Sequence, residues 1–238
     1  MKIRDMMANT PLLTAAVACG MFLLMGCNNR NEVRSLQAVQ PLEAKAMQQS
    51  FRGLLPCADC EGIDTALFLE KDGSWVMNQR YQGAPQPTQF ASWGKWARTA
   101  DKLVLTDTNG EKYYFRVKGE NLEMLDRDGN PIESPLNYTL TPSRAALPVT
   151  PMAMKGLYFY MADAAVFTDC ATGKRFPVMN NAQLERGFAA AQQGETKPVL
   201  LHVEGHFILQ ANPDSGAMQK TLVADNPGAF KPGADCDD

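Results

Sequence analysis

The chain contains one CxxC spacing, Cys57-Ala58-Asp59-Cys60, and this motif carries the clearest chemistry. A redox dithiol of the thioredoxin type needs a helix at the first cysteine, which stabilises its thiolate. Here Glu61-Gly62-Ile63-Asp64 leads directly into a predicted strand, which makes that interpretation the weakest. Two thiolates suit a soft ion such as Cu(I), and the carboxylates of Asp59 and Glu61 favour a cation. A small disulfide is the third interpretation, and it is favoured in an oxidising compartment.

The N-terminus has the features of an export signal. Lys2 and Arg4 precede an apolar run from Pro11 to Met25, shorter than the roughly 20 apolar residues that span a bilayer. The run ends at Gly26-Cys27, and a polar segment follows. This pattern predicts a lipoprotein signal peptide over residues 1–26, with Cys27 as the lipidated first residue of the mature chain.

Lipid is therefore the expected membrane anchor. We expect a diacylglycerol and an N-acyl chain on Cys27, attached in the course of export, with residues 27–49 as a lipidated tether. By the sorting rule for such lipoproteins, Asn28 rather than Asp after the cysteine predicts the outer membrane, on its periplasmic face. The lipoprotein-sorting machinery is then an expected partner.

Six cysteines define the redox chemistry: Cys19, Cys27, Cys57, Cys60, Cys170 and Cys236. Cys19 leaves with the signal peptide and Cys27 carries lipid, so four remain in an oxidising compartment. Four cysteines allow three pairings, and pairing within each half of the chain is the most economical. A bond between Cys170 and Cys236 would close a long loop, contribute about 4 kcal/mol and fasten the C-terminal tail.

Other candidates for chemistry are weaker. His202 and His206 lie four residues apart in a predicted strand, about 13 Å, which is too far to share a metal and favours a solvated strand face. Met152 and Met154 suit a thioether copper contact, but methionine more often fills a core. The sequence has no nucleophile elbow, phosphate-binding loop or dinucleotide fingerprint, and we predict that the protein is not an enzyme.

Strands must position these residues, because residues 50–140 alternate short apolar runs with tight turns. The predicted strands are Thr65–Glu70, Trp75–Tyr81, Ala91–Arg98, Lys102–Thr106, Lys112–Lys118 and Leu122–Leu125. Strands joined by tight turns form an antiparallel meander, and closing it into a barrel hides its edges. The aromatic residues of this half either line a cavity for an apolar ligand or plug the barrel themselves.

The second half has a different pattern. Residues 141–153 contain three prolines, at positions 142, 148 and 151, and are predicted to be a linker. Over residues 154–238 three strands (Lys155–Met161, Val166–Thr168 and Lys174–Val178) precede one helix, Ala182–Gln192, and two strands follow it (Val199–Gln210 and Lys220–Ala224). This is the element order of an OB-fold. The predicted class is all-β, mainly strands, with a barrel domain and an OB-fold domain containing one helix.

The overall composition excludes several classes of protein. The chain has 238 residues with 23 Lys and Arg against 26 Asp and Glu, a net charge of -3, and 45% hydrophobic residues. These are globular proportions, which exclude a disordered, collagenous or coiled-coil chain. The mildly acidic balance lacks the basic field that nucleic-acid binding needs, so no nucleic-acid partner is expected.

Several segments together resemble the NlpE (CutF) family of bacterial envelope lipoproteins. They are Leu24–Arg30 around the lipidation cysteine, Leu54–Ile63 around the CxxC motif, Phe68–Gly73, Trp96–Thr106 and Phe159–Ala165. The resemblance covers essentially the whole mature chain. It implies a lipocalin-like N-terminal barrel and a C-terminal OB-fold domain.

The resemblance also implies a function. Members of the family are associated with copper homeostasis, surface adhesion and activation of the Cpx envelope-stress system through its sensor kinase CpxA. Cys57 and Cys60 match the pair proposed as the copper motif, and Cys170 and Cys236 match the C-terminal pair whose oxidation state is linked to redox sensing. The alternative is a lipocalin-like carrier of an apolar ligand at the outer membrane.

Overall fold

The computed structural model describes residues 49–83, 88–179, 182–192, 194 and 196–238. All of these belong to the second of the two units into which the chain divides, Met1–Leu42 and Glu43–Asp238. The predicted signal peptide over residues 1–26, the lipidation site Cys27 and the tether up to residue 48 lie outside the described residues. Within the described ranges, no helix is long and apolar enough to cross a membrane.

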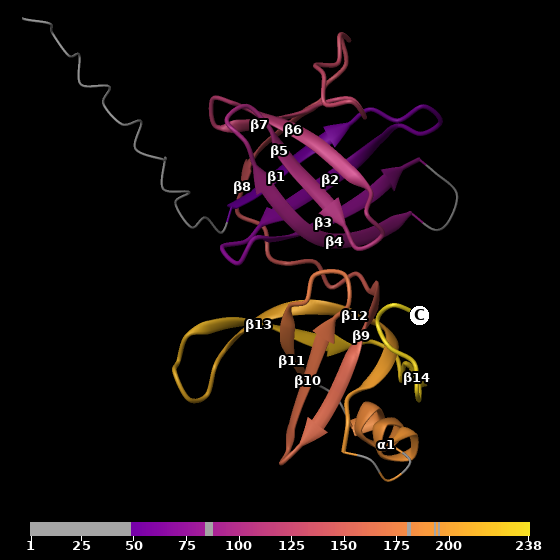
Figure 1. Ribbon diagram of the computed structural model, residues 1–238. Helices are drawn as coiled ribbons and strands as arrows, with labels where there is room; N and C mark the ends of the chain where they lie inside the picture. Colours follow the sequence, from indigo (N-terminus) through magenta and orange to yellow (C-terminus); the bar gives the residue numbers. More distant parts are fainter. Residues whose placement is uncertain (1–48, 84–87, 180–181, 193, 195) are drawn as a thin grey trace, which may run out of the picture. The chain divides into compact units, whose positions relative to one another are not determined.

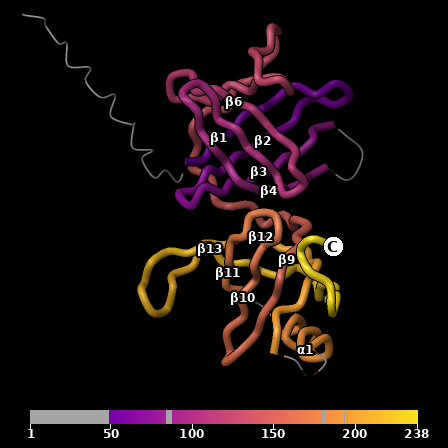
Figure 2. The backbone as a smooth tube through the Cα atoms, viewed as in Figure 1, coloured from indigo at the N-terminus to yellow at the C-terminus, as the bar shows by residue number. Residues whose placement is uncertain are grey.

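The N-terminal half is a closed barrel of eight strands. In chain order the strands are β1 (Gln49–Leu55), β2 (Gly62–Leu69), β3 (Ser74–Gln82), β4 (Gln89–Arg98), β5 (Leu103–Asp107), β6 (Lys112–Lys118), β7 (Asn121–Met124) and β8 (Thr139–Ser143). Each strand pairs antiparallel with the next, and β8 pairs with β1 to close the ring, as Figures 1 and 2 show. This up-and-down order is that of a lipocalin-like barrel, and it confirms the predicted fold class for this half.

Side chains fill the interior of the barrel. Alternate residues of each strand point inward, and they form one buried apolar cluster. Its members are Phe51, Leu55, Leu67, Leu69, Trp75, Met77, Leu103, Leu105, Phe115, Leu122 and Leu140. At the centre Trp75 is fully buried, and its indole N–H donates to the carbonyl oxygen of Lys95 at 3.0 Å. Of the two interpretations left open by the aromatic residues, this packing supports a barrel plugged by its own side chains.

The C-terminal half is a second, smaller barrel. Its elements are β9 (Met152–Met161), β10 (Ala164–Asp169), β11 (Arg175–Met179), α1 (Ala182–Ala191), β12 (Val199–Ala211), β13 (Met218–Ala224) and β14 (Ala229–Lys231). The strand order is β13-β11-β10-β9-β12, and β12 also pairs with β13, which closes the ring. β11 and β13 run parallel, and the helix lies between β11 and β12 in the chain (Figure 1). This is OB-fold topology, and it confirms the predicted class of this half and its helix.

One apolar cluster joins the two barrels. Phe68, Val76 and Trp93 alternate with the inward residues of β2, β3 and β4 and therefore point out of the first barrel, yet each is at most 7% exposed. They pack with Phe176 and Phe207 of the second barrel. The Trp93 ring lies edge-on to both phenylalanines, with ring centroids 5.6 Å and 5.0 Å away. Edge-to-face aromatic pairs at this spacing add stability beyond their buried area.

A buried ion pair lies beside this cluster. The Lys220 ammonium on β13 lies 3.0 Å from Glu70 Oε2 and donates to Ser74 Oγ at 2.6 Å. The Glu70 and Lys220 side chains are only 8% and 5% exposed. Burial raises the pKa of the Glu70 carboxyl above its ordinary value, and the positive charge of Lys220 opposes that rise.

The structure contains three strands that were not predicted, and one predicted strand that begins earlier. β1, β8 and β14 are strands that the hydrophobic pattern does not predict. β8 contains Pro142, which lacks a backbone N–H and is typical of a linker, but its pairing with β1 extends over three residues only. β9 begins at Met152 rather than Lys155, so that residues 144–151 are the part of the segment between the barrels without regular structure.

Candidate functional site

The CxxC pair lies in the connection between β1 and β2. In the structure Cys57 and Cys60 form a disulfide, with their Cα atoms 5.3 Å apart. Asp59 Oδ1 lies 3.5 Å from the Cys57 sulfur, and the intervening Ala58 and Asp59 are exposed. The next element is β2, which begins at Gly62, so that no helix follows this pair of the kind that thioredoxin-type chemistry requires.

The disulfide form of this pair does not suit a metal. Copper binds thiolates, and a disulfide has none to offer. Within the described residues, no group of three or more His, Cys, Asp or Glu side chains is placed to hold a metal ion. The predicted metal role of Cys57 and Cys60 therefore requires reduction first, and the reduced pair would supply two sulfur ligands.

Removing the CxxC disulfide should lower stability only modestly. The bond joins cysteines three positions apart and closes a very short loop. In the chain-entropy model a loop of this length is worth about 2 kcal/mol. We expect a Cys57→Ser/Cys60→Ser variant to lose that much free energy of unfolding, measured by chemical denaturation under oxidising conditions. A loss of twice this size would show that the pair holds more structure than its own loop.

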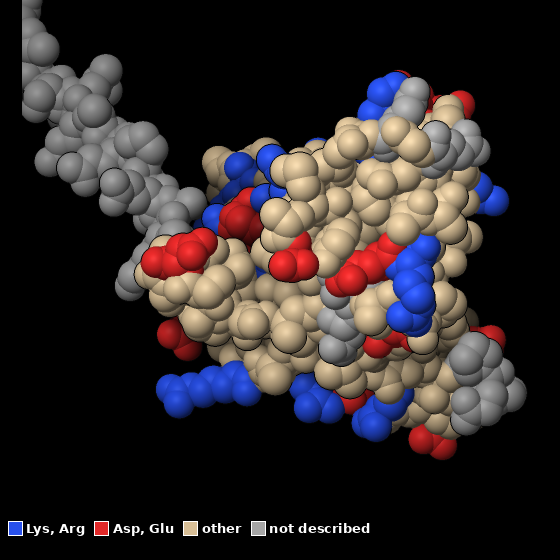
Figure 3. All heavy atoms as spheres, turned by 90° about the horizontal axis from the view of Figure 1, so that it is seen from below, with Lys and Arg blue, Asp and Glu red and all other residues tan. Residues whose placement is uncertain are grey.

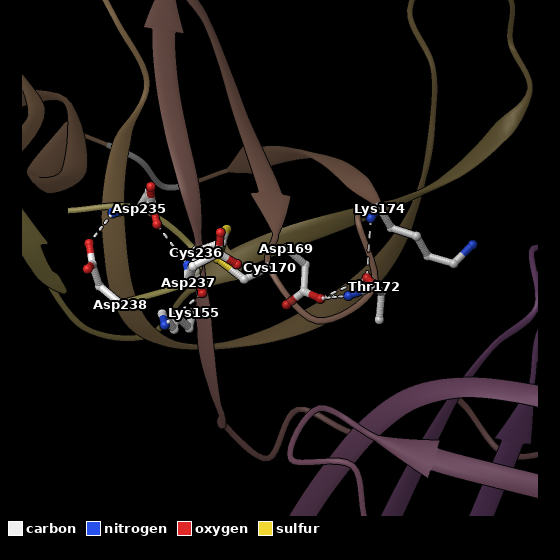
Figure 4. Close-up of a disulfide and its surroundings, with 9 residues drawn as sticks. All are labelled: Lys155, Asp169, Cys170, Thr172, Lys174, Asp235, Cys236, Asp237 and Asp238. Atoms are coloured by element: carbon white, nitrogen blue, oxygen red, sulfur yellow. Dashed lines mark hydrogen bonds between the residues drawn. A yellow bond between two sulfur atoms is a disulfide. The ribbon is translucent and has the colours of Figure 1, made fainter. Parts of the chain in front are cut away.

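The second pair joins a turn to the C-terminal tail. Cys170 follows β10 directly, and Cys236 is the third residue from the end of the chain. In the structure Cys170 and Cys236 form a disulfide, with their Cα atoms 5.2 Å apart and a sequence separation of 66 (Figure 4). A hollow of about 700 Å³ lies beside the bond and is lined by both cysteines, Lys155 and His202 among others. Cys170 and Cys236 are both half-buried beside this hollow.

A buried carboxylate shapes the turn that carries Cys170. Asp169 is 2% exposed, and its Oδ2 accepts hydrogen bonds from the backbone N–H and the hydroxyl of Thr172, both at 2.7 Å (Figure 4). Burial raises the pKa of the Asp169 carboxyl, and the bonds from Thr172 oppose the rise. These bonds brace the turn from Asp169 to Lys174, in which Cys170 lies.

Lys155 contacts both cysteines of the second pair. Its carbonyl oxygen accepts the N–H of Cys170 at 3.0 Å, and its ammonium donates to the carbonyl oxygen of Cys236 at 3.1 Å. No motif in the sequence points to this residue. The signal that could have identified it is a lysine within the otherwise apolar strand Met152–Met161.

The other candidates from the sequence do not form a site. His202 is exposed on β12, and His206 is half-buried with its Nδ1 2.9 Å from Asp225 Oδ2. The two histidines are not brought together on a metal. Met152 and Met154 are 3% and 4% exposed in the core of the second barrel, where they fill space.

The surface charges are mixed in sign. On the face drawn in Figure 3, basic and acidic side chains are interspersed rather than gathered into one basic patch. Ion pairs also join neighbouring strands of the first barrel. Arg52 and Arg80 both contact Asp64, and the bond from Arg52 lowers the pKa of that carboxyl.

Comparisons with known proteins extend over both barrels. A family model described as the NlpE N-terminal domain matches residues 51–135, and one described as the NlpE C-terminal OB domain matches residues 148–237. The chain is 62% identical over 231 residues to "Lipoprotein NlpE" of Escherichia coli (strain K12), which covers 97% of this chain and 98% of that protein.

Two solved structures are also similar. The crystal structure of the Cpx pathway activator NlpE from Escherichia coli shares 64% sequence identity over 81% of this chain and 99% of that chain, with a TM-score of 0.40. The crystal structure of a putative lipoprotein from Shewanella oneidensis shares 33% identity over 40% of this chain and 88% of that chain, with a TM-score of 0.35.

Proposed function

The chain belongs to the NlpE family, and on that premise we propose that it is a non-enzymatic, lipid-anchored envelope sensor that activates the Cpx stress response. The family relationship covers nearly the whole of both chains, and the Escherichia coli relative of known structure is described as a Cpx pathway activator. The proposed receiver of the signal is the sensor kinase CpxA. The proposed anchor is lipid on Cys27 at the periplasmic face of the outer membrane, reached through the lipoprotein-sorting machinery.

The observation that carries this proposal is the Cys170–Cys236 disulfide. It fastens the last residues of the chain to the turn after β10, at the edge of the OB-fold domain. Without the bond the tail loses its covalent restraint, and the surface beneath it becomes available to a partner. Oxidation state is thereby converted into exposure of protein surface, which a kinase can recognise.

A Cpx-dependent reporter tests this directly. A Cys170→Ser/Cys236→Ser protein should raise the reporter signal above wild type at equal abundance, and deletion of the kinase should abolish the increase. A Cys57→Ser/Cys60→Ser protein is the matched control, because it loses a disulfide from the other domain. A Cys170→Ser/Cys236→Ser protein that signals no more strongly than wild type would contradict the redox part of the proposal.

Sorting is the second input of the proposed sensor. A protein that fails to receive lipid on Cys27, or that is not transported, stays near the inner membrane and meets the kinase there. Adhesion to surfaces and copper tolerance belong to the same proposal through the family relationship. The supporting feature for copper is the CxxC pair alone.

Copper binding should depend on the redox state of Cys57 and Cys60. Because the pair is a disulfide in the structure, oxidised protein should take up no Cu(I) at this site. In a Cys170→Ser/Cys236→Ser background, reduction should produce binding of one Cu(I) per chain, and further replacement of Cys57 and Cys60 by Ser should abolish it. Competition with a chromophoric Cu(I) chelator measures both. Undiminished binding without Cys57 and Cys60 would move the copper site elsewhere.

A further inference from the structure

Lys155 forms hydrogen bonds with both Cys170 and Cys236, one through its backbone carbonyl and one through its side-chain ammonium. The carbonyl oxygen bonds the N–H of Cys170, and the ammonium bonds the carbonyl of Cys236, as Figure 4 shows for the tail. Neither hydrogen bond uses a sulfur atom. Both can therefore persist when the disulfide is reduced.

The base of this contact is rigid. Lys155 is half-buried on β9, the strand that pairs with β10 on one side and β12 on the other. In the β9–β12 ladder Lys155 lies opposite His202. Because the two neighbouring strands fix its backbone, docking the ammonium on the tail costs only the rotamer freedom of this one side chain.

The tail near Cys236 has a conformation of its own. The N–H of Ala234 donates to the carbonyl oxygen of Lys231, and the N–H groups of Asp235 and Asp237 donate to carboxylate oxygens within the same segment, at 2.7 and 2.8 Å. These short-range bonds do not depend on the disulfide. The ammonium of Lys155 therefore binds a preformed turn rather than a random chain.

We propose that Lys155 is a positioning residue for thiol–disulfide exchange at Cys170 and Cys236. After reduction it keeps the Cys236 thiol near the Cys170 thiol, so that the bond re-forms readily. The proposal deepens the redox role proposed above and rests on it for its biological meaning. It makes the sensor reversible, because the reduced tail can leave the surface beneath it open to a partner and still return to Lys155, where the bond re-forms.

The oxidation that Lys155 assists is a balanced exchange with a low-molecular-weight disulfide such as oxidised glutathione. One protein thiolate attacks a glutathione sulfur, which forms a mixed disulfide and releases one glutathione thiolate. The second protein thiolate then attacks the mixed disulfide, which forms the Cys170–Cys236 bond and releases the second glutathione thiolate. The two protons of the protein thiols pass to the two released thiolates. Lys155 acts on the second, intramolecular step.

The effective concentration of the two thiols tests the proposal. Full-length protein in detergent, with Cys57 and Cys60 replaced by Ser, is equilibrated with reduced and oxidised glutathione, and the thiols are trapped and counted by mass spectrometry. Because a hydrogen bond from a charged donor is lost, Lys155→Met should lower the effective concentration about tenfold. Lys155→Arg keeps a charged donor and should stay within about threefold of the Lys155 protein.

Lys231→Met is the matched control, since it removes the same charge from β14, next to the tail, and should leave the effective concentration unchanged. An unchanged value in Lys155→Met overturns the proposal, and so does an equal fall in Lys231→Met. A fall in Lys155→Met accompanied by an equal loss of thermal stability of the oxidised form would make the role merely structural. If Lys155→Met does not fold when reduced, failure of Lys155→Arg to retain the effective concentration overturns it. The assay reads the sulfurs and not the Cpx signal, so the proposed function can fail while this inference stands.

Discussion

Replacing Lys220 by Met should lower the free energy of unfolding by about 3–5 kcal/mol at neutral pH. The substitution removes the partner of Glu70 while the carboxylate remains almost completely buried. An unpaired buried charge is among the most costly defects a fold can contain. Glu70 Oε1 already has no hydrogen-bond partner, so the variant would leave the whole carboxylate unsatisfied. Chemical denaturation at constant pH measures the loss.

A double variant separates the charge effect from the packing effect. Glu70→Leu/Lys220→Met replaces both charged groups with apolar side chains of similar size, and should recover most of the stability lost in the single variant. Ser74 does not become unpaired in this variant, because its hydroxyl also donates to Asp72 Oδ1. A double variant as unstable as Lys220→Met would show that shape rather than charge governs this position.

The loss in Lys220→Met should also depend on pH. The folded-state pKa of Glu70 is raised by burial, and removing the opposing charge of Lys220 raises it further. A carboxyl of this kind contributes stability that is present below its unfolded pKa and is lost as the pH rises through its folded pKa. The variant should therefore approach wild type at acidic pH, where Glu70 is neutral, and fall behind it as the pH rises. A loss independent of pH would exclude Glu70 as its source.

Removing the Cys170–Cys236 disulfide should cost about 4 kcal/mol, because the bond closes a long loop in the unfolded chain. The expected result is a shift of the denaturation midpoint of Cys170→Ser/Cys236→Ser to lower denaturant under oxidising conditions. The loss should be about twice that of Cys57→Ser/Cys60→Ser, which opens a far shorter loop.

Reduction gives an independent check of the same quantity. In excess reductant both disulfides of the wild-type protein are open. Its free energy of unfolding should therefore fall by about the sum of the losses from the two single-pair variants. Equal losses from the two pairs would show that loop length does not govern their contributions. A loss from Cys170→Ser/Cys236→Ser below 1 kcal/mol, measured against the about 4 kcal/mol expected, would mean that the tail is held by other contacts.

Much of the fold follows from local patterns in the chain. The alternation in Lys112–Lys118 and the hairpin turn at Asp72-Gly73 predict antiparallel strands, and the structure confirms them as β6 and the β2–β3 hairpin. The helix predicted over Ala182–Gln192 is α1, which ends one residue earlier. The sequence predicts these elements because each depends on residues only a few positions apart in the chain.

Local patterns do not predict strands that are stabilised mainly by pairing with distant segments. β8 carries Pro142 and reads as a linker, but β1 lies about ninety positions away in the chain and pairs with it to close the barrel. β14 has only three residues, and it is a strand because it pairs antiparallel with β12. Long-range pairing of this kind depends on topology, and no window of neighbouring residues contains it.

The chemical groups divide in the same way. The types and spacing of the cysteines predict a lipid on Cys27, and they leave three possible pairings for the other four cysteines of the mature chain, because both predictions depend on residue identity alone. Glu70 and Lys220 have ordinary surface identities, in a turn and on a strand end, and their pairing across 150 positions emerges when two barrels pack together. The same holds for Lys155, which becomes a contact of both cysteines because β9 runs between the turn at Cys170 and the tail. Motifs such as the CxxC pair can be recognised from neighbouring residues, whereas the burial of a side chain and its hydrogen-bond or ion-pair partner depend on how distant segments pack.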